Sequence, residues 1–381
     1  MNPIKVLTVF GTRPEAIKMA PLVLELQGRR ELACRVCVTA QHREMLDGVL
    51  RCFGIMPDHD LDIMAPNQTL EDITTRALAG LRRVYDEEKP DLVLVHGDTS
   101  TSFAGALAAH YARIPVGHVE AGLRTGDRYS PFPEEMNRRL TAQLASYHFA
   151  PTRQNAENLR REGVEEGVFV TGNTVIDAMR HTVGDGRFQT PALQALDFEG
   201  RRVIALTCHR RENYGAPMEN IFAAVRDIAK TVPEAEFVYP VHPSPAVREA
   251  AERLLGKSPR VHLLEPLDAM EMHRLMARCH MVMTDSGGLQ EEAPALGKPV
   301  LVLRRETERP EAVEAGTALL AGTQQAEIRD LALSLLTDDA FYARMATAVN
   351  PYGDGHACPR IADAILYGFG RLTTPPPAFA P

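Results

Sequence analysis

Residues 279–299, CHMVMTDSGGLQEEAPALGKP, combine a short apolar run with a glycine-rich helix start. The run 279–285 is mostly apolar and ends in Asp285, which is typical of a buried strand. Ser286, Gly287 and Gly288 then open a helix, so free backbone N–H groups and a hydroxyl could face an anion with no Cβ in the way. This pattern predicts a diphosphate site at a strand end. A plain glycine-rich helix start is the alternative.

Similar apolar runs recur through the chain, separated by segments with helical spacing. They are IKVLTVF (4–10), CRVCVTA (34–40), DLVLVHG (91–97), IPVGHVE (114–120), YHFAPT (147–152), GVFVTG (167–172), RRVIALTC (201–208), AEFVYPV (235–241), PRVHLLE (259–265), CHMVMTD (279–285) and KPVLVLR (298–304). Strands that are apolar on both faces and alternate with helices favour parallel sheets covered by helices. We therefore predict an α/β fold with two Rossmann-like, doubly wound parallel-sheet domains.

The length of 381 residues also favours two domains. The glycine-punctuated stretch 171–186 marks the seam, which gives an N-terminal domain at 1–172 and a C-terminal domain at 173–359. The proline-rich end, 373–381, is expected to be an extended, flexible tail.

Bulk composition excludes several classes of protein. A net charge of −8 gives no general attraction for nucleic acid. The start of the chain lacks a signal-peptide pattern, and no run approaches 18 apolar residues, so we expect a cytoplasmic protein without a membrane partner. No H-E-x-x-H motif or Cys-His cluster indicates a metal site.

Charged side chains directly follow several runs in the first half. Arg13 and Lys18 follow the run 4–10 at a helix start, which favours an anion site, with solvated cations as the alternative. Asp98 follows the run 91–97, where an aspartate serves either as a helix N-cap or in chemistry. Glu120 and Glu134 lie among arginines past another run, as solvated surface or as proton carriers.

The second half repeats this arrangement. His209 and Arg210 follow one run and His242 the next, and two histidines at consecutive strand ends favour a site over purely structural roles. Glu292 lies one turn beyond Gly288, within reach of ribose hydroxyls, and Arg309 adds a cation in a further loop. Because ligands bind at the carboxyl ends of parallel strands, these positions predict a nucleotide-sugar enzyme with its site between the domains.

These motifs also resemble a known family, the bacterial non-hydrolysing UDP-N-acetylglucosamine 2-epimerases. The matching stretches are VFGTRPEAIKMAPL, CVTAQHREMLD, VHGDTSTS, GHVEAGLRTGDRYSPFPEEMNRRL, GNTVIDA, HRREN, YPVHP, DSGGLQEEAPALGKPVLV, TERPEAVEAGT and NPYGDG. The resemblance implies the GT-B type of fold with a central cleft, a C-terminal helix at about 360–372 packing back on the first domain, and a homodimer. It also implies reversible conversion of UDP-GlcNAc to UDP-ManNAc without a cofactor.

The resemblance further implies roles for individual residues. Catalysis would involve Asp98, Glu120, Glu134 and His209. Substrate would be bound by Arg13, Lys18, Leu267, Met272, Ser286, Gly287, Gly288, Glu292 and Arg309. Met272 stands where family members often carry Phe, which would give the uracil pocket a thioether wall.

Some relatives bind a second UDP-GlcNAc molecule as an effector, and Gln41, Arg210 and His242 match residues implied in that contact. Glu44 and Asn67 depart from the pattern. We therefore expect activation by UDP-GlcNAc to be weak or absent.

The chemistry fits these residue types. The C2 proton of an N-acetylhexosamine is not α to a carbonyl, and no nicotinamide motif is present to oxidise a neighbouring carbon. Departure of UDP from C1 would acidify the C2 hydrogen and give a 2-acetamidoglucal, which is then protonated on the other face before UDP returns.

This route needs donors for the diphosphate and a base and an acid on opposite faces. Which carboxylate serves which face stays open. The product would supply ManNAc-type sugars for cell-surface polysaccharide. A GT-B glycosyltransferase using a UDP-sugar, a hydrolysing epimerase that releases ManNAc, and a non-catalytic UDP-sugar sensor are the alternatives.

Overall fold

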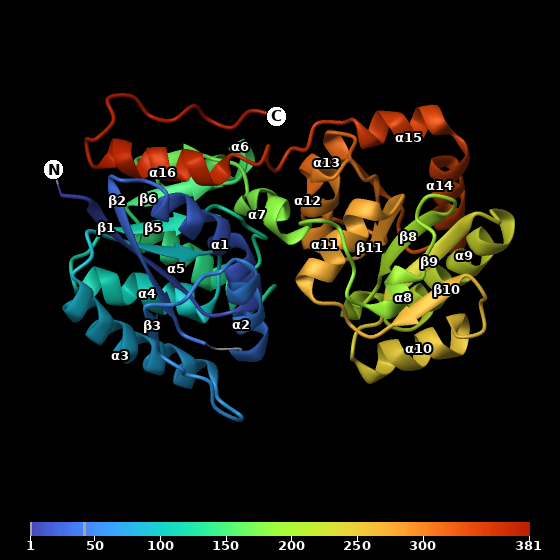
Figure 1. Ribbon diagram of the computed structural model, residues 1–381, viewed down its shortest axis with the longest axis horizontal. Coiled ribbons are helices and arrows are strands. Elements are labelled where there is room, and N and C mark those ends of the chain that lie inside the picture. Colours follow the sequence, from blue (N-terminus) through green and yellow to red (C-terminus); the bar gives the residue numbers. More distant parts are fainter. Residues whose placement is uncertain (1, 41–42) are drawn as a thin grey trace. The chain divides into compact units, whose positions relative to one another are not determined.

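The computed structural model describes residues 2–40 and 43–381. It divides into two compact units, Met1–His181 with Tyr352–Ala380, and Thr182–Pro351 (Figure 1). These limits differ from the boundaries expected from sequence, 172/173 and 359/360. Local hydrogen bonds explain the difference: the Asn173 N–H donates to the Tyr352 carbonyl at 2.7 Å. The buried Asp177 carboxylate also accepts from the N–H groups of Ala357 and Cys358 at 3.1 and 2.9 Å.

The first unit is built on a seven-stranded parallel sheet in the order β3-β2-β1-β4-β5-β6-β7. Its strands are β1 (Ile4–Phe10), β2 (Leu32–Val38), β3 (His59–Asp60), β4 (Leu92–His96), β5 (Val116–Val119), β6 (Tyr147–Ala150) and β7 (Val168–Val170). Its helices are α1 (Arg13–Gln27), α2 (Arg43–Cys52), α3 (Leu70–Glu88), α4 (Ser100–Tyr111), α5 (Glu134–Leu144), α6 (Arg153–Arg161), α7 (Thr174–Thr182) and α16 (Ala357–Gly368).

Helices cover this sheet in two groups. Helix α1 packs against α2 and α16, while α3, α4 and α5 pack side by side (Figure 1). Buried side chains of β1 and β4, such as Val9 and Val95, form one core with Leu81 of α3 and Ala104 of α4. Apolar residues on both faces of the strands therefore have helices to pack against.

The second unit is built on a six-stranded parallel sheet in the order β10-β9-β8-β11-β12-β13. Its strands are β8 (Arg202–Thr207), β9 (Ala235–Pro240), β10 (Val261–Leu264), β11 (Met281–Thr284), β12 (Val300–Val302) and β13 (Ala318–Leu320). Its helices are α8 (Pro191–Gln194), the 3-10 turn η1 (Arg211–Asn213), α9 (Ala216–Thr231), α10 (Pro245–Leu255), α11 (Ala269–Arg278), α12 (Gly287–Ala295), α13 (Pro310–Glu314), α14 (Gln325–Thr337) and α15 (Asp339–Ala346).

The predicted fold class, two doubly wound parallel sheets, is confirmed. Strands β3 and β13 were not predicted. Both are short edge strands: the two residues of β3 are polar, and the three apolar residues of β13 are too few to indicate a strand. In each sheet the chain changes direction between β1 and β4, or between β8 and β11, which is the topological switch point where such sheets bind ligands.

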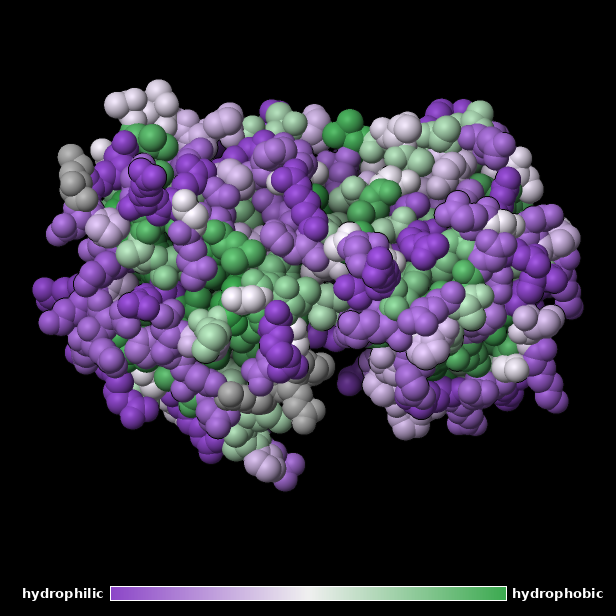
Figure 2. All heavy atoms as spheres, viewed as in Figure 1, coloured by the Kyte–Doolittle hydropathy of each residue, from purple (hydrophilic) through white to green (hydrophobic). Residues whose placement is uncertain are grey.

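The C-terminal tail packs against the first unit at Phe379. Phe379 is 2% exposed, its N–H donates to the Val170 carbonyl at 2.8 Å, and the Arg360 guanidinium lies 5.5 Å from its ring centroid. Tight packing at this residue differs from the freely mobile tail expected from composition. Figure 2 shows that hydrophilic side chains dominate the rest of the visible surface, in keeping with 24% charged residues.

Candidate active site

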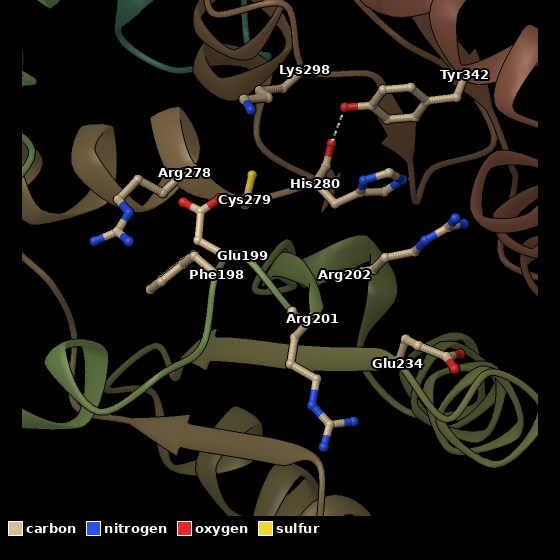
Figure 3. A pocket seen from close by; sticks show the side chains of 11 residues that line it. Phe198, Glu199, Arg201, Arg202, Glu234, Arg278, Cys279, His280, Lys298 and Tyr342 are labelled. Carbon is tan, nitrogen blue, oxygen red and sulfur yellow. Dashed lines mark hydrogen bonds between the residues drawn. The ribbon is translucent and has the colours of Figure 1, made fainter.

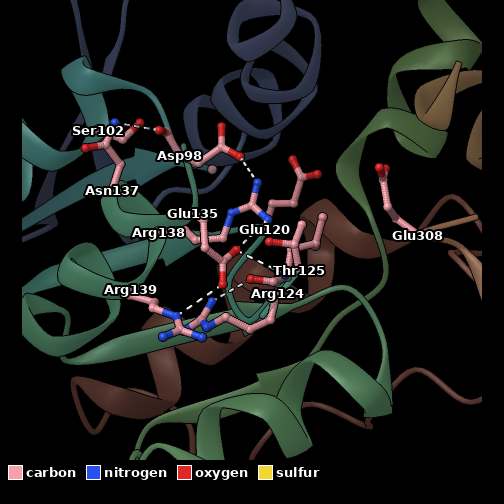
Figure 4. Close-up of polar contacts among 12 residues, drawn as sticks. Asp98, Ser102, Glu120, Arg124, Thr125, Glu135, Asn137, Arg138, Arg139 and Glu308 are labelled. Atoms are coloured by element: carbon pink, nitrogen blue, oxygen red, sulfur yellow. Dashed lines mark hydrogen bonds and ion pairs between the residues drawn. The ribbon is translucent and has the colours of Figure 1, made fainter. Parts of the chain in front are cut away.

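Asp98 lies in the turn between β4 and α4, at the carboxyl edge of the first sheet. Thr99, not Asp98, caps α4, because its Oγ1 accepts the Ser102 N–H at 3.1 Å. The Asp98 carboxylate instead forms a salt bridge with Arg138 of α5, and the Asn137 side chain donates to the Asp98 carbonyl at 2.9 Å (Figure 4). The Asp98 side chain is 31% exposed. Its carboxylate is therefore held in place but remains accessible for chemistry.

Glu120 directly follows β5, the neighbour of β4. Its φ of 61° lies in the left-handed region, a strained conformation for a residue other than glycine and one that clusters at functional sites. The Lys18 Nζ lies 2.7 Å from both carboxylate oxygens, and the His96 Nε2 lies 2.8 Å from Oε2. Burial raises the pKa of Glu120, but the Lys18 charge and the His96 contact outweigh it and hold the pKa well below its ordinary value. Glu120 is thus an ionised carboxylate at neutral pH.

Glu134 is the first residue of α5, and its neighbour Glu135 has a different role. The Glu134 Oε2 is buried and has no hydrogen-bond partner within residues 2–40 and 43–381. Glu135 is fully buried and accepts the N–H groups of Thr125 and Gly126 at 3.1 and 3.3 Å (Figure 4). Glu135 therefore anchors the loop before α5, while Glu134 keeps an oxygen unused by the fold.

The arginines near these carboxylates have different partners. Arg138 contacts Asp98. Arg124 instead binds Glu162 through two hydrogen bonds of 2.9 and 2.7 Å, and Arg139 contacts Glu135 and Glu162. Among the described residues, Arg124 and Arg139 therefore share the carboxylate of Glu162, which lies at the end of α6. Its position gave no signal in the sequence.

Arg13 begins α1, close to Lys18. The Glu15 carboxylate accepts the N–H groups of Gly11 and Thr12 at 3.0 and 2.8 Å, so the helix start already holds an anion from the chain itself. The Arg13 guanidinium is half-buried and forms no hydrogen bond or ion pair with the described residues. It is therefore the part of this helix start that stays available to an external anion.

Helix α12 of the second unit begins without a cap. Ser286 occupies the N-cap position, and its side chain accepts no N–H group from the helix. A Cβ atom built on Gly287 would meet nothing closer than Nη2 of Arg210 at 3.7 Å and Cζ of Arg309 at 3.8 Å. Free N–H groups flanked by two guanidinium groups form a site suited to a diphosphate.

Asp285 organises this site, a role that the sequence analysis did not assign. Its buried carboxylate accepts the N–H groups of His209 and Arg210, both at 2.8 Å, and the Asn213 side chain at 3.0 Å. The ring of His209 stacks on that of His242 with centroids 5.2 Å apart. Burial, helped by His242 and Arg210 and opposed by Asp285, lowers the pKa of His209. The sequence feature that could have indicated the role of Asp285 is its position directly after a buried strand.

The remaining predicted residues lie on nearby elements of the second unit. Glu292 is on α12, and its Oε2 lies 3.3 Å from the Nε2 of His273. Arg309 lies before α13 and forms a salt bridge with Glu291. Leu267 and Met272 are half-buried before and within α11. Gln41, predicted for the effector contact, lies outside the described residues.

A separate pocket of about 350 Å³ lies at the opposite, amino-terminal edge of the second sheet, before β8, β11 and β12. Arg201, Arg202 and Arg278 line it, but their guanidinium groups diverge (Figure 3). They do not converge on a common anion, so the pocket is not part of the candidate site.

The described residues contain no group of three or more His, Cys, Asp or Glu side chains placed to hold a metal ion. No helix in this part of the chain is both long and apolar enough to cross a membrane.

Two Rossmann-like units, an uncapped helix start with arginines and a strand edge with three carboxylates define the class of nucleotide-sugar enzymes. Comparison with known proteins gives the family. The sequence model of the UDP-N-acetylglucosamine 2-epimerases matches residues 24–366. The chain belongs to this family and is therefore an isomerase.

Similarity to individual relatives extends over nearly the whole chain. The UDP-N-acetylglucosamine 2-epimerase of Bacillus subtilis is 56% identical over 380 residues, covering 100% of this chain and 99% of the relative. The structure of UDP-GlcNAc 2-epimerase from Neisseria meningitidis bound to UDP-GlcNAc is 50% identical, with a TM-score of 0.86 and coverage of 96% and 100%. S. aureus MnaA in complex with UDP is also 50% identical, with a TM-score of 0.87 and coverage of 99% and 100%.

Proposed function

We propose that this chain interconverts UDP-GlcNAc and UDP-ManNAc reversibly, without hydrolysis, by eliminating UDP to a 2-acetamidoglucal and adding it back. The observation that carries the proposal is the ionised Glu120 carboxylate, held at the same sheet edge as two further carboxylates, Asp98 and Glu134. One ionised group can accept a proton while another group delivers one.

We assign UDP binding mainly to the second unit. The N–H groups at Gly287 and Gly288, the Ser286 hydroxyl and the Arg309 guanidinium would bind the diphosphate, with His209 and Arg13 as further donors. Glu292 would accept from the ribose hydroxyls, and Leu267 and Met272 would contact uracil. The relatives solved with UDP and with UDP-GlcNAc support this assignment.

In the elimination, a carboxylate removes the C2 proton and the C–H electron pair forms the C1–C2 double bond. The C1–O bond breaks before this step or nearly together with it, and UDP leaves with its electron pair, stabilised by the diphosphate donors. Delivery of a proton to the other face of C2 and return of UDP to C1 complete the cycle. Glu120 serves as the base in one direction, and Asp98 and Glu134 are the candidates for the opposite face.

We further propose that the enzyme is a cytoplasmic homodimer and supplies ManNAc-type sugars for cell-surface polysaccharide. Full-length similarity to bacterial epimerases supports this assignment. Sedimentation velocity at micromolar concentration should give the mass of two chains, and a single species of about 42 kDa would contradict the dimer.

A proton NMR time course with UDP-GlcNAc and enzyme alone tests the proposed activity. The anomeric signal of UDP-ManNAc should grow to a constant ratio with UDP-GlcNAc. Accumulating free ManNAc would show a hydrolysing epimerase, and UDP formed only when an acceptor sugar is added would show a glycosyltransferase. An unchanged spectrum would show a UDP-sugar sensor.

A further inference from the structure

We propose that His96 is a positioning residue for Glu120. The His96 ring lies against Oε2 of the Glu120 carboxylate and leaves Oε1 to exchange the C2 proton. The inference rests on the proposed function, because it assumes that Glu120 exchanges this proton. His96 itself is not expected to touch the substrate, and its effect would pass through Glu120.

Backbone contacts place the His96 ring beside Glu120. His96 is the last residue of β4 and is paired in register with Val119 of β5, directly before Glu120. The Gly97 N–H donates to the Val119 carbonyl at 2.9 Å, and the Ser102 hydroxyl donates to the His96 carbonyl. The end of β4 is thus tied both to β5 and to the first turn of α4.

The ring nitrogen facing Glu120 has no alternative partner. Nε2 of His96 lies 2.8 Å from Oε2 of Glu120, which is an ion-pair distance, but this buried nitrogen forms no hydrogen bond of acceptable angle with any described residue. His96 is 4% exposed, so water cannot readily take the place of a partner. Burying a ring nitrogen without a hydrogen bond lowers the stability of the fold, so its place beside the Glu120 carboxylate calls for a functional reason.

The two oxygens of Glu120 consequently differ. Oε2 faces both Lys18 and His96, whereas Oε1 faces Lys18. A carboxylate has about two acceptor positions on each oxygen. The Lys18 ammonium and the nearby His96 ring both lie against Oε2, so the more open acceptor position for a proton is on Oε1.

The groups around Glu120 set its charge. Lys18 faces it from α1 and His96 from β4, while the Asp98–Arg138 pair occupies the neighbouring strand end. His118 of β5 is fully buried, and burial lowers its pKa to about 3, so it stays neutral at working pH. Removing the His96 contact leaves Lys18 as the stabilising partner, and the pKa of Glu120 then rises.

The test compares His96→Leu, which removes the nitrogen, with His96→Gln, whose amide nitrogen can occupy the place of Nε2. In His96→Leu we expect the kcat to fall about 10- to 100-fold with little change in KM, the scale of a misplaced catalytic group. The acidic limb of the kcat profile should also move to higher pH, because a carboxylate with a higher pKa needs a higher pH to ionise. His96→Gln should restore most of the kcat and the original limb.

Two results would overturn the inference: a His96→Leu pH profile that matches the wild type, or a His96→Gln variant as impaired as His96→Leu. If His96→Leu does not fold, His96→Asn replaces it, because the shorter amide keeps the polarity but cannot reach Oε2. Thermal unfolding of each variant separates lost stability from lost positioning.

Glu120→Gln, measured alongside, separates this inference from the proposed function. An active Glu120→Gln variant would remove the proposed role of Glu120. An inactive one together with an unaffected His96→Leu would refute only the role of His96.

Discussion

Glu120 and Glu135 are both largely buried carboxylates, but their surroundings give them different tasks. Glu135 accepts backbone N–H groups of the loop it anchors and has arginines on the same helix. No backbone N–H of the described residues donates to Glu120, which faces two side chains that keep it ionised. A carboxylate held by side chains alone can gain and lose a proton without unfolding a loop.

At the residue scale, Asp98→Asn, Glu120→Gln and Glu134→Gln should each lower kcat by at least ~100-fold, because each removes a group that carries a proton. NMR turnover assays measure the effect. Glu162→Gln is the control, since it breaks a comparable pair with Arg124 without touching the proposed chemistry. A variant with near-normal turnover would show that its residue is structural.

Two buried histidines predict the acid sensitivity of the first unit. Burial lowers the pKa of His118 to about 3 and of His148 to about 4, whereas unfolded histidine titrates near ~6.5. Between pH of about 6.5 and 4 the unfolded chain binds protons that the folded chain does not. The free energy of unfolding should therefore fall as pH falls, by about 1.4 kcal/mol per pH unit for each histidine.

Urea unfolding at pH values from 7.5 to 4.5 measures this slope. His148→Gln should reduce it by about one proton, while His356→Gln, which changes an exposed histidine, should leave it unchanged. The carboxylate of Glu120 adds stability with the same sign, since a depressed pKa gives stability that is lost as pH falls through the folded value. A wild-type slope of zero over this range would contradict the prediction.

At the scale of elements, α1 and α12 show two ways to begin a helix after a strand. Helix α1 satisfies the N–H groups of its turn with its own Glu15, whereas α12 has no side-chain cap. Both starts have glycine nearby, but the glycines serve different purposes. A Cβ on Gly11 would meet Oγ1 of Thr39 at 1.9 Å, so that glycine is needed for packing. The space beside Gly287 is open, so a ligand can approach the backbone there.

Gly287→Val should therefore abolish UDP binding and leave the fold intact. The added methyl groups would occupy the space where a phosphate meets the helix N–H groups, while the protein itself leaves that space open. Calorimetry with UDP measures the loss of affinity. Gly48→Val, in α2 and with nothing within 4 Å of its Cβ position, is the matched control. Equal UDP affinity in both variants would exclude the α12 start from the site.

At the scale of the whole molecule, the elimination makes two isotopic predictions. In D₂O the product should carry deuterium at C2, because the proton delivered comes from a group that exchanges with solvent. An ¹⁸O label bridging C1 and the β-phosphate should scramble among the β-phosphate oxygens, since the freed phosphate can rotate before UDP returns. NMR and mass spectrometry measure both. Full epimerisation with the label retained would exclude the glycal route.

The sequence by itself determined the fold class and the positions of most candidate residues. Apolar runs alternating with helical segments are a local property, and residues that follow parallel strands must gather at one edge of a sheet. Asp98, Glu120 and the 286–288 stretch were found in this way. The edge strands β3 and β13 were not predicted, because two or three residues are too few to show a periodic pattern.

The tertiary structure alone decided which side chains pair. That Asp98 pairs with Arg138, that Glu162 binds Arg124, and that His96 and Lys18 converge on Glu120 depend on residues far apart in the chain. The same holds for Asp285, which ties the loop after β8 to the start of α12. Sequence order places a charged group at a strand end, but its pKa and its free oxygens depend on distances that only the packed chain fixes.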